Sequence, residues 1–216
     1  MTGEGQPATP ETPIRLQQEE GRIVIDAAVL RLTFLKSGER WVHTLEVADP
    51  ASEGGFREVA QSMEGEIAGG DPTRVVSPAY QEIHVQPMDE GARLLLTGQS
   101  TPHHFSAVLT VRREPSGLVE VEFDTADRCR GPISAFAATY LVPLGTGAIV
   151  DADESRVIFG GNVLGAGRLE FLPGEPCQTS LAEAGRRGLR VQALARIDAA
   201  TATQRLPYRW RWSPRG

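Results

Sequence analysis

The chain has 216 residues, a formal net charge of −6 and a pI near 5.3. A chain of this length can bury one sizeable core, so we expect one domain over residues 14–216. The negative charge and the scattered basic residues argue against a nucleic-acid partner, and no apolar run is long enough to span a membrane. We expect no export signal and a cytoplasmic location.

After Met1, residues 1–13 contain no aliphatic side chain larger than that of Ala8 and are rich in Gly, Pro, Thr and Glu. Such a segment cannot bury enough apolar surface to offset the entropy of ordering, so we predict a disordered N-terminal arm. From Ile14 onwards, short alternations of apolar and polar residues are separated by turn residues. This period of two is typical of half-buried strands, and it predicts an all-β protein.

The clearest alternation runs from Phe105 to Thr125 and is interrupted by a turn sequence at residues 113–117. It predicts a β-hairpin with one dry and one charged face. The remaining candidates bring the number of strands to about ten, spaced as in an antiparallel β-sandwich of the supersandwich type. These candidates are Arg22–Phe34, Trp41–Val47, Tyr80–Val85, Ala92–Thr97, Ala135–Val142, Arg156–Phe159, Leu189–Ile197 and Leu206–Trp212.

Two segments depart from the β pattern. Apolar residues between Phe56 and Ile67 fall at helical spacing, and Ser180–Glu183 matches a capping box that Gly188 would close. We therefore expect one or two short helices, with an ordered excursion as the alternative for the first segment because it contains Gly54, Gly55 and Gly65. In the last candidate strand, Pro207 indicates an edge strand or a strand start, because proline cannot donate to a ladder.

Several aromatic residues stand beside polar ones, a mixture that suits stacking on sugar rings and hydrogen bonding to hydroxyls. On this basis the candidate ligand-binding residues are Trp41, His43, Tyr80, His103, Tyr208 and Arg209. The alternative for such residues is a place in the core, which we favour for Trp210 and Trp212. The sequence contains no metal-ligand motif, and we expect neither a metal nor a cofactor.

Three stretches give the chain a resemblance to the galactose mutarotase-like superfamily. Arg22–Val42 is similar to the opening strands of that fold, Leu118–Thr125 to its long central strand, and Phe136–Leu144 to the strand that follows. The resemblance implies a β-supersandwich and a role in handling carbohydrate. The catalytic histidine segment of the mutarotases has no counterpart between Cys129 and Tyr140, so no catalytic residue is carried over from the family.

We consider three hypotheses for function. In the first, the protein binds carbohydrate, and at least one of Trp41, Tyr80 and Tyr208 is exposed beside polar partners. In the second, it is a sugar-acting isomerase or lyase, which requires an imidazole and a carboxylate to converge within roughly 6 to 8 Å. The candidate catalytic residues are His84 and His104, with Glu82 or Glu154 as the carboxylate.

The third hypothesis is a structural module that assembles through its own sheet. The C-terminal strand, with Arg209 and Arg211 on one face, is the candidate interface strand, and its pairing with a second copy would give a homodimer.

Overall fold

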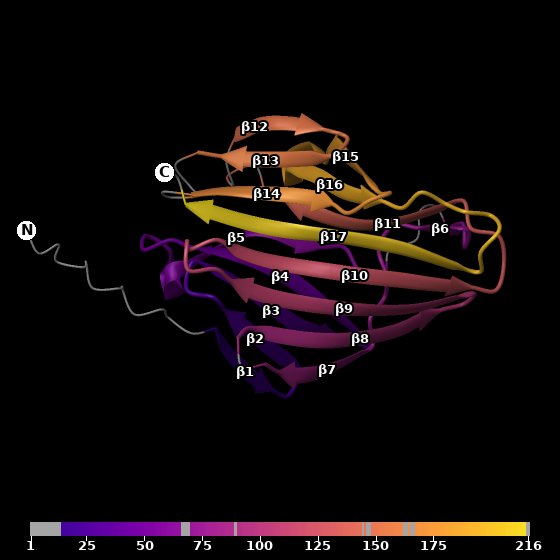
Figure 1. The fold of residues 1–216 in the computed structure, drawn as a ribbon, viewed down its shortest axis with the longest axis horizontal. Coiled ribbons are helices and arrows are strands. Elements are labelled where there is room, and N and C mark those ends of the chain that lie inside the picture. The colour runs from indigo at the N-terminus through magenta and orange to yellow at the C-terminus, as the bar shows by residue number, and fades with distance from the viewer. Residues whose placement is uncertain are drawn as a thin grey trace, which may run out of the picture.

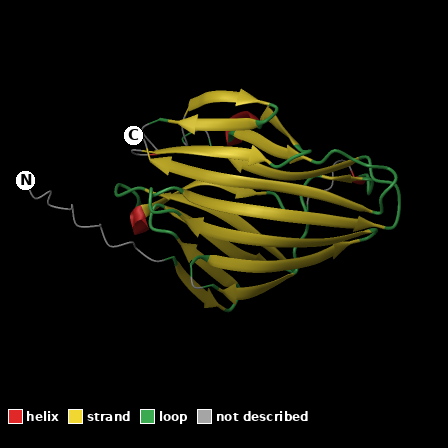
Figure 2. Ribbon diagram, viewed as in Figure 1, coloured by secondary structure: helices red, strands yellow, loops and turns green. Residues whose placement is uncertain are grey.

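A computed structural model describes residues 14–65, 70–88, 90–143, 145, 148–161, 164 and 167–214. In this part of the chain the strands form two stacked sheets, which confirms the all-β sandwich (Figures 1 and 2). The expected disordered arm, residues 1–13, lies outside the described residues.

The first sheet has nine strands and is antiparallel except for one short parallel pairing beside β11. Its strands in spatial order are β1 (Arg15–Glu19), β2 (Arg22–Asp26), β3 (Leu30–Ser37), β4 (Arg40–Ala48), β5 (Phe56–Ser62), β11 (Ala135–Val142), β16 (Leu189–Leu194) and β15 (Gln178–Glu183), with β6 (Arg74–Val75) paired to β11.

The second sheet has eight antiparallel strands and lies in front of the first in Figure 1. Its order is β12 (Ala148–Asp153), β13 (Arg156–Gly160), β14 (Gly167–Pro173), β17 (Thr203–Pro214), β10 (Val119–Cys129), β9 (His103–Arg113), β8 (Ala92–Ser100) and β7 (Glu82–Pro87).

The predicted hairpin is confirmed as β9 and β10. Leu109 faces Phe123 and Val111 faces Val121 across the pair, and all four side chains are buried between the sheets. The turn closes where Gly117 adopts a φ of +83° and donates its N–H to the Glu114 carbonyl at 2.9 Å. One hydrophobic core fills the space between the two sheets.

The helix expected between Phe56 and Ile67 is wrong over its described part, and residues 66–67 lie outside the described residues. The helical turn expected after Ser180 is displaced, since a single 3₁₀ turn at Gly185–Arg187 ends at Gly188, the residue predicted to close it. Residues 56–62 form β5, which pairs with β4, and residues 178–183 form β15, which pairs with β16. Tertiary pairing overrides the local pattern in both segments, since short helical periods are easily imitated by chance. Single 3₁₀ turns are present at Glu53–Gly55 and Gly185–Arg187.

The expectation that Pro207 marks an edge or the start of a strand is also wrong, because β17 lies between β14 and β10. The Pro207 carbonyl accepts a hydrogen bond from Gly174 N at 2.8 Å, just past the end of β14. In an antiparallel strand the N and C=O of a residue point to the same side. The missing N–H of Pro207 therefore faces the end of β14, and no bond to β10 is lost.

Candidate functional site

Five of the six residues proposed to bind a ligand lie inside the sandwich. Trp41 is 9% exposed, Tyr80 1% and Tyr208 4%, so the expectation that one of them is accessible is wrong. Trp41 and His43 share the inward face of β4 with Leu45 and Val47, and Tyr208 shares that of β17 with Trp210. Their burial removes the surface stacking on which the sugar-binding assignment depended. Trp210 and Trp212 are in the core, as favoured from the sequence.

His43 is at the centre of a chain of polar contacts that crosses the core. Its Nδ1 lies 2.7 Å from Oε1 of Glu64, and its Nε2 lies 2.8 Å from the hydroxyl oxygen of Tyr140. The Tyr140 hydroxyl lies 3.1 Å from that of Tyr208, which belongs to the opposite sheet. Ser62 donates its hydroxyl to Glu64 and accepts the His43 N–H at 2.8 Å.

Protonation of this chain follows from its burial. Loss of solvation raises the pKa of Tyr140 and of Tyr208 well above 10, and the nearby Glu64 carboxylate adds to the effect. Both phenols therefore keep their protons. Tyr140 can then donate to His43 Nε2 and Tyr208 to Tyr140. These hydrogen bonds link His43 and the two phenols across the interior and so connect the two sheets.

His103 forms a second buried pair near one end of the sandwich. Its Nε2 lies 2.6 Å from the Pro72 carbonyl oxygen, which can only accept, so this nitrogen carries a proton. Its Nδ1 lies 2.7 Å from Oδ2 of Asp127, whose side chain is fully buried. Loss of solvation raises the pKa of Asp127 above its ordinary 3.8, while the bond to His103 partly opposes this. The pair ties the segment around Pro72 to β9 and β10.

Space beside these groups is small. A cavity of about 10 Å³ is lined by His103, Phe105, Gly65, Ser77 and Ala79, and it has room for one water molecule at most. A sugar ring cannot enter it. The described interior therefore uses His43, His103, Tyr80 and Tyr208 as internal hydrogen-bonding groups, and a ligand must be sought on the surface.

The other candidates lie on the solvent face of the eight-stranded sheet or beyond its edge. Glu82 and His84 are exposed on β7, and His104 is exposed on β9. From the strand spacing and the rise per residue, the backbone positions of Glu82 and His104 are roughly 12 Å apart, and those of His84 and His104 roughly 17 Å. Glu154 follows β12 at the opposite edge of the sheet. The expected spacing of imidazole and carboxylate is therefore met only by Glu82 and His84, which lie roughly 7 Å apart on the same face of the edge strand β7. His104 and Glu154 do not join this pair.

The same face contains a shallow groove of about 360 Å³, which we call the outer groove. It runs over β8, β9, β10 and β17, and the side chains on its surface include Leu95, Thr97, Ser106, Val108, Asp124, Ala126 and Arg205. Val108 is 39% exposed at its floor. Asp124 and Arg205 form an ion pair at its side. Its volume lies at the lower end of the range for small-molecule sites.

Sequence reasoning missed the outer groove, although part of its signal is local. The alternation that places Phe123 and Val121 in the core also places Asp124 and Ala126 on the outside. Ala126, Ser106 and Thr97 lie side by side only because of the register of the three strands that carry them. The sequence pattern along one strand does not predict that register.

Two further observations concern the described residues as a whole. They contain no helix with the length and apolar character needed to cross a bilayer. They also contain no group of three or more His, Cys, Asp and Glu side chains placed to hold a metal ion.

No protein-family model matches the chain, and no curated protein is significantly similar to it.

Proposed function

We propose that the protein binds carbohydrate in the outer groove. The observation that carries the proposal is a recess that has an aliphatic floor, Leu95 and Val108, beside hydroxyl and charged groups. Aliphatic side chains can contact the C–H face of a pyranose ring, while Thr97, Ser106 and the Asp124–Arg205 pair supply donors and acceptors for its hydroxyls. The resemblance to the mutarotase-like superfamily supports a sugar as the ligand.

The distribution of titratable groups favours binding over catalysis. Acid–base chemistry on a sugar needs two groups close enough to act on one ring. Among the described residues that line the outer groove there is one carboxylate, Asp124, and no imidazole, and the closely paired groups, His43–Glu64 and His103–Asp127, are buried. A shallow open groove of this kind gives modest affinity.

The proposal is tested by filling the outer groove. Ala126→Trp places a large side chain on its floor, whereas Leu35→Trp places one at an exposed position on the opposite sheet. Both variants and the parent protein are applied to an array of immobilised oligosaccharides, with circular dichroism to confirm the fold. We expect binding that is lost in Ala126→Trp and kept in Leu35→Trp. Equal binding by both variants, or no binding by the parent protein, would overturn the proposal.

The readout must not rely on tryptophan fluorescence. Trp41, Trp210 and Trp212 are at most 9% exposed, so a ligand on the outer face does not contact them.

Arg205→Ala provides a second variant with a small expected effect on folding, since this exposed arginine is paired only with an exposed carboxylate.

A further inference from the structure

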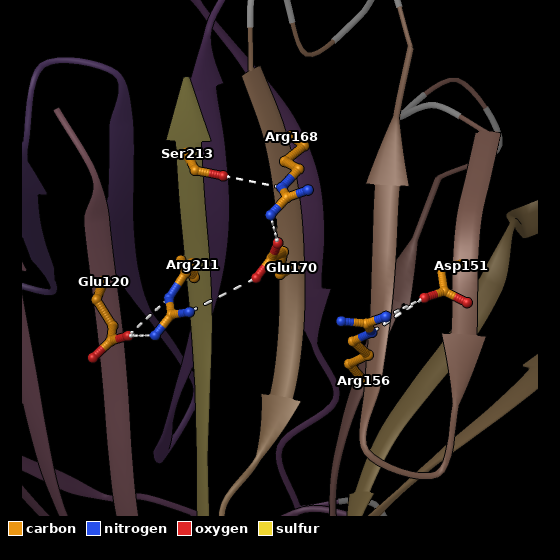
Figure 3. Close-up of polar contacts among 7 residues, drawn as sticks. All are labelled: Glu120, Asp151, Arg156, Arg168, Glu170, Arg211 and Ser213. Carbon is orange, nitrogen blue, oxygen red and sulfur yellow. Dashed lines mark hydrogen bonds and ion pairs between the residues drawn. The ribbon is translucent and has the colours of Figure 1, made fainter. Parts of the chain in front are cut away.

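Charges on one half of the outer face are paired with one another. Figure 3 shows Arg211 between Glu120 and Glu170, on three adjacent strands. Arg211 donates to Glu120 from Nε at 3.1 Å and from Nη2 at 2.9 Å, and Arg168 lies 2.8 Å from Glu170. Arg209 also lies 3.3 Å from Glu120. The arginines of β14 and β17 in this region thus already have carboxylate partners.

The far edge of the sheet shows the same pairing. Arg156 at the start of β13 donates to Asp151 of β12 from Nε and Nη2, at 3.1 and 2.6 Å (Figure 3). An incoming anion would have to compete with this carboxylate. This part of the face is therefore a poor anion site, and it offers a matched control position.

Arginines at the ends of the outer groove are different. Among the described residues, Arg93 of β8 and Arg128 of β10 have no carboxylate partner, and the buried Nε of Arg93 has no hydrogen-bond acceptor. The cross-strand register places Arg93 in the row of Glu122, six residues from Arg128 along β10. The two arginines are thus separated by roughly 20 Å along the strands.

Other charges near the groove do not cancel these two. Asp124 is neutralised by Arg205, and Glu122 lies 3.5 Å from Arg112. Glu82, at the edge strand, accepts a hydrogen bond from Thr97 at 3.2 Å. His104 is exposed on β9, directly opposite Arg128. The groove therefore has a basic group at each end within a chain of net charge −6.

We infer that the ligand of the outer groove is an acidic oligosaccharide whose uronic acid carboxylates bind Arg93 and Arg128. The inference rests on the proposed function and specifies its ligand. A guanidinium group without a partner matches the planar fork of a carboxylate, and two of them at this separation suit an extended chain that bears a charge on each sugar. The negative charge of the whole protein disfavours polyanions that cannot also fill the groove.

Calorimetric titration with matched hexasaccharides tests this inference. The probes are hexagalacturonate and hexamannuronate, each compared with the neutral hexamer in which C6 is not oxidised. We expect at least one acidic hexamer to bind at least tenfold more tightly than its neutral partner at low salt. Arg93→Gln and Arg128→Gln should each reduce that preference severalfold, while Arg156→Gln at the paired far edge should leave it unchanged.

Each remaining outcome has a distinct meaning. Equal binding of acidic and neutral hexamers, or a preference that survives both substitutions, overturns the acidic ligand and leaves carbohydrate binding standing. Binding of neither type overturns the proposed function as well. Equally tight binding of poly-L-glutamate of the same charge overturns the inference, because binding would then depend on charge attraction alone and not on the fit of a sugar in the groove. Arg128 is exposed, so its variant tests the inference even if Arg93→Gln does not fold.

Discussion

Two histidines in the dry interior each lie between a carboxylate and an oxygen atom. His43 joins Glu64 to Tyr140, and His103 joins Asp127 to the Pro72 carbonyl. A buried polar group without a partner costs about 1–3 kcal/mol, more for a charge, so such chains are sensitive to the loss of any inner member. This sensitivity distinguishes a structural network from a ligand site, where a substitution would change binding and leave stability nearly intact.

Tyr140 and Tyr208 provide a matched test of the chain through His43. Tyr140→Phe leaves both His43 Nε2 and the Tyr208 hydroxyl without a partner, whereas Tyr208→Phe removes only the last member. We expect the free energy of unfolding to fall by about 2–3 kcal/mol for Tyr140→Phe and by about 1 kcal/mol for Tyr208→Phe. Urea denaturation measures both. Equal losses of the free energy of unfolding would show that the polar contacts through His43 do not depend on Tyr140.

Asp127 gives a pH dependence with a definite sign. Burial raises the pKa of its carboxyl group in the folded protein, so it still holds a proton at pH values where the unfolded chain, with a pKa of 3.8, has released it. The native state then binds more protons, and stability falls as the pH rises from about 4 through the folded pKa. Asp127→Asn should remove this component, so the parent protein should lose stability relative to the variant over that interval in urea titrations. A constant difference would contradict the account.

The alternation of apolar and polar residues along β4 already indicates that the side chains of Trp41 and His43 point into the core. Trp41 and His43 have the same parity as Leu45 and Val47, which already indicates an inward direction. Their polar neighbours suggested a ligand site, although the partners of His43 are Glu64 and Tyr140, which are distant from it in sequence. Partnerships of this kind depend on strand order, which the pattern along one strand does not contain.

At the level of elements, the alternating strands were predictable and the exceptions were not. The hairpin of β9 and β10 follows from its alternation and turn. β5 and β15 were mistaken for helices because their few apolar residues also fit a helical period, and only pairing with β4 and β16 decides between the two. Pro207 lies within a central strand because its N–H side faces the end of β14.

Gly98 of β8 allows the chain to cross between the sheets. A Cβ at this position would lie 1.8 Å from the Ala79 carbonyl oxygen, and the neighbouring Tyr80 carbonyl accepts a hydrogen bond from Trp41 N. We expect Gly98→Ala to lower the free energy of unfolding by about 2–3 kcal/mol, because backbone must move. Gly131→Ala is the control, since nothing lies within 4 Å of its Cβ and its φ is not positive. Denaturation midpoints measure both, and equal shifts would argue against the close approach.

On the scale of the whole molecule, a single core joins the two sheets. Trp41 reports on the nine-stranded sheet and Trp210 on the eight-stranded sheet, and both belong to the same buried cluster. We therefore expect fluorescence and far-ultraviolet circular dichroism to show one coincident unfolding transition. Two separated transitions would mean that the sheets unfold independently, contrary to a shared core.

The charge of the whole molecule also bears on function. The chain is acidic overall, yet the two arginines at the ends of the outer groove lack carboxylate partners among the described residues, while those of β14 and β17 are paired within the face. The composition alone gives the overall charge. The difference between paired and unpaired arginines on one face depends on how five strands are arranged in the sheet.

Chemical-shift mapping tests the central claim, that the outer groove is the ligand surface, most directly. Amide spectra of the ¹⁵N-labelled protein are recorded while hexagalacturonate is added. The account expects the largest shifts at Thr97, Ser106, Val108 and Ala126, with little change at His43 and Tyr140 in the core. Shifts centred on the core, or on the outer surface of the nine-stranded sheet around Leu35, would contradict it.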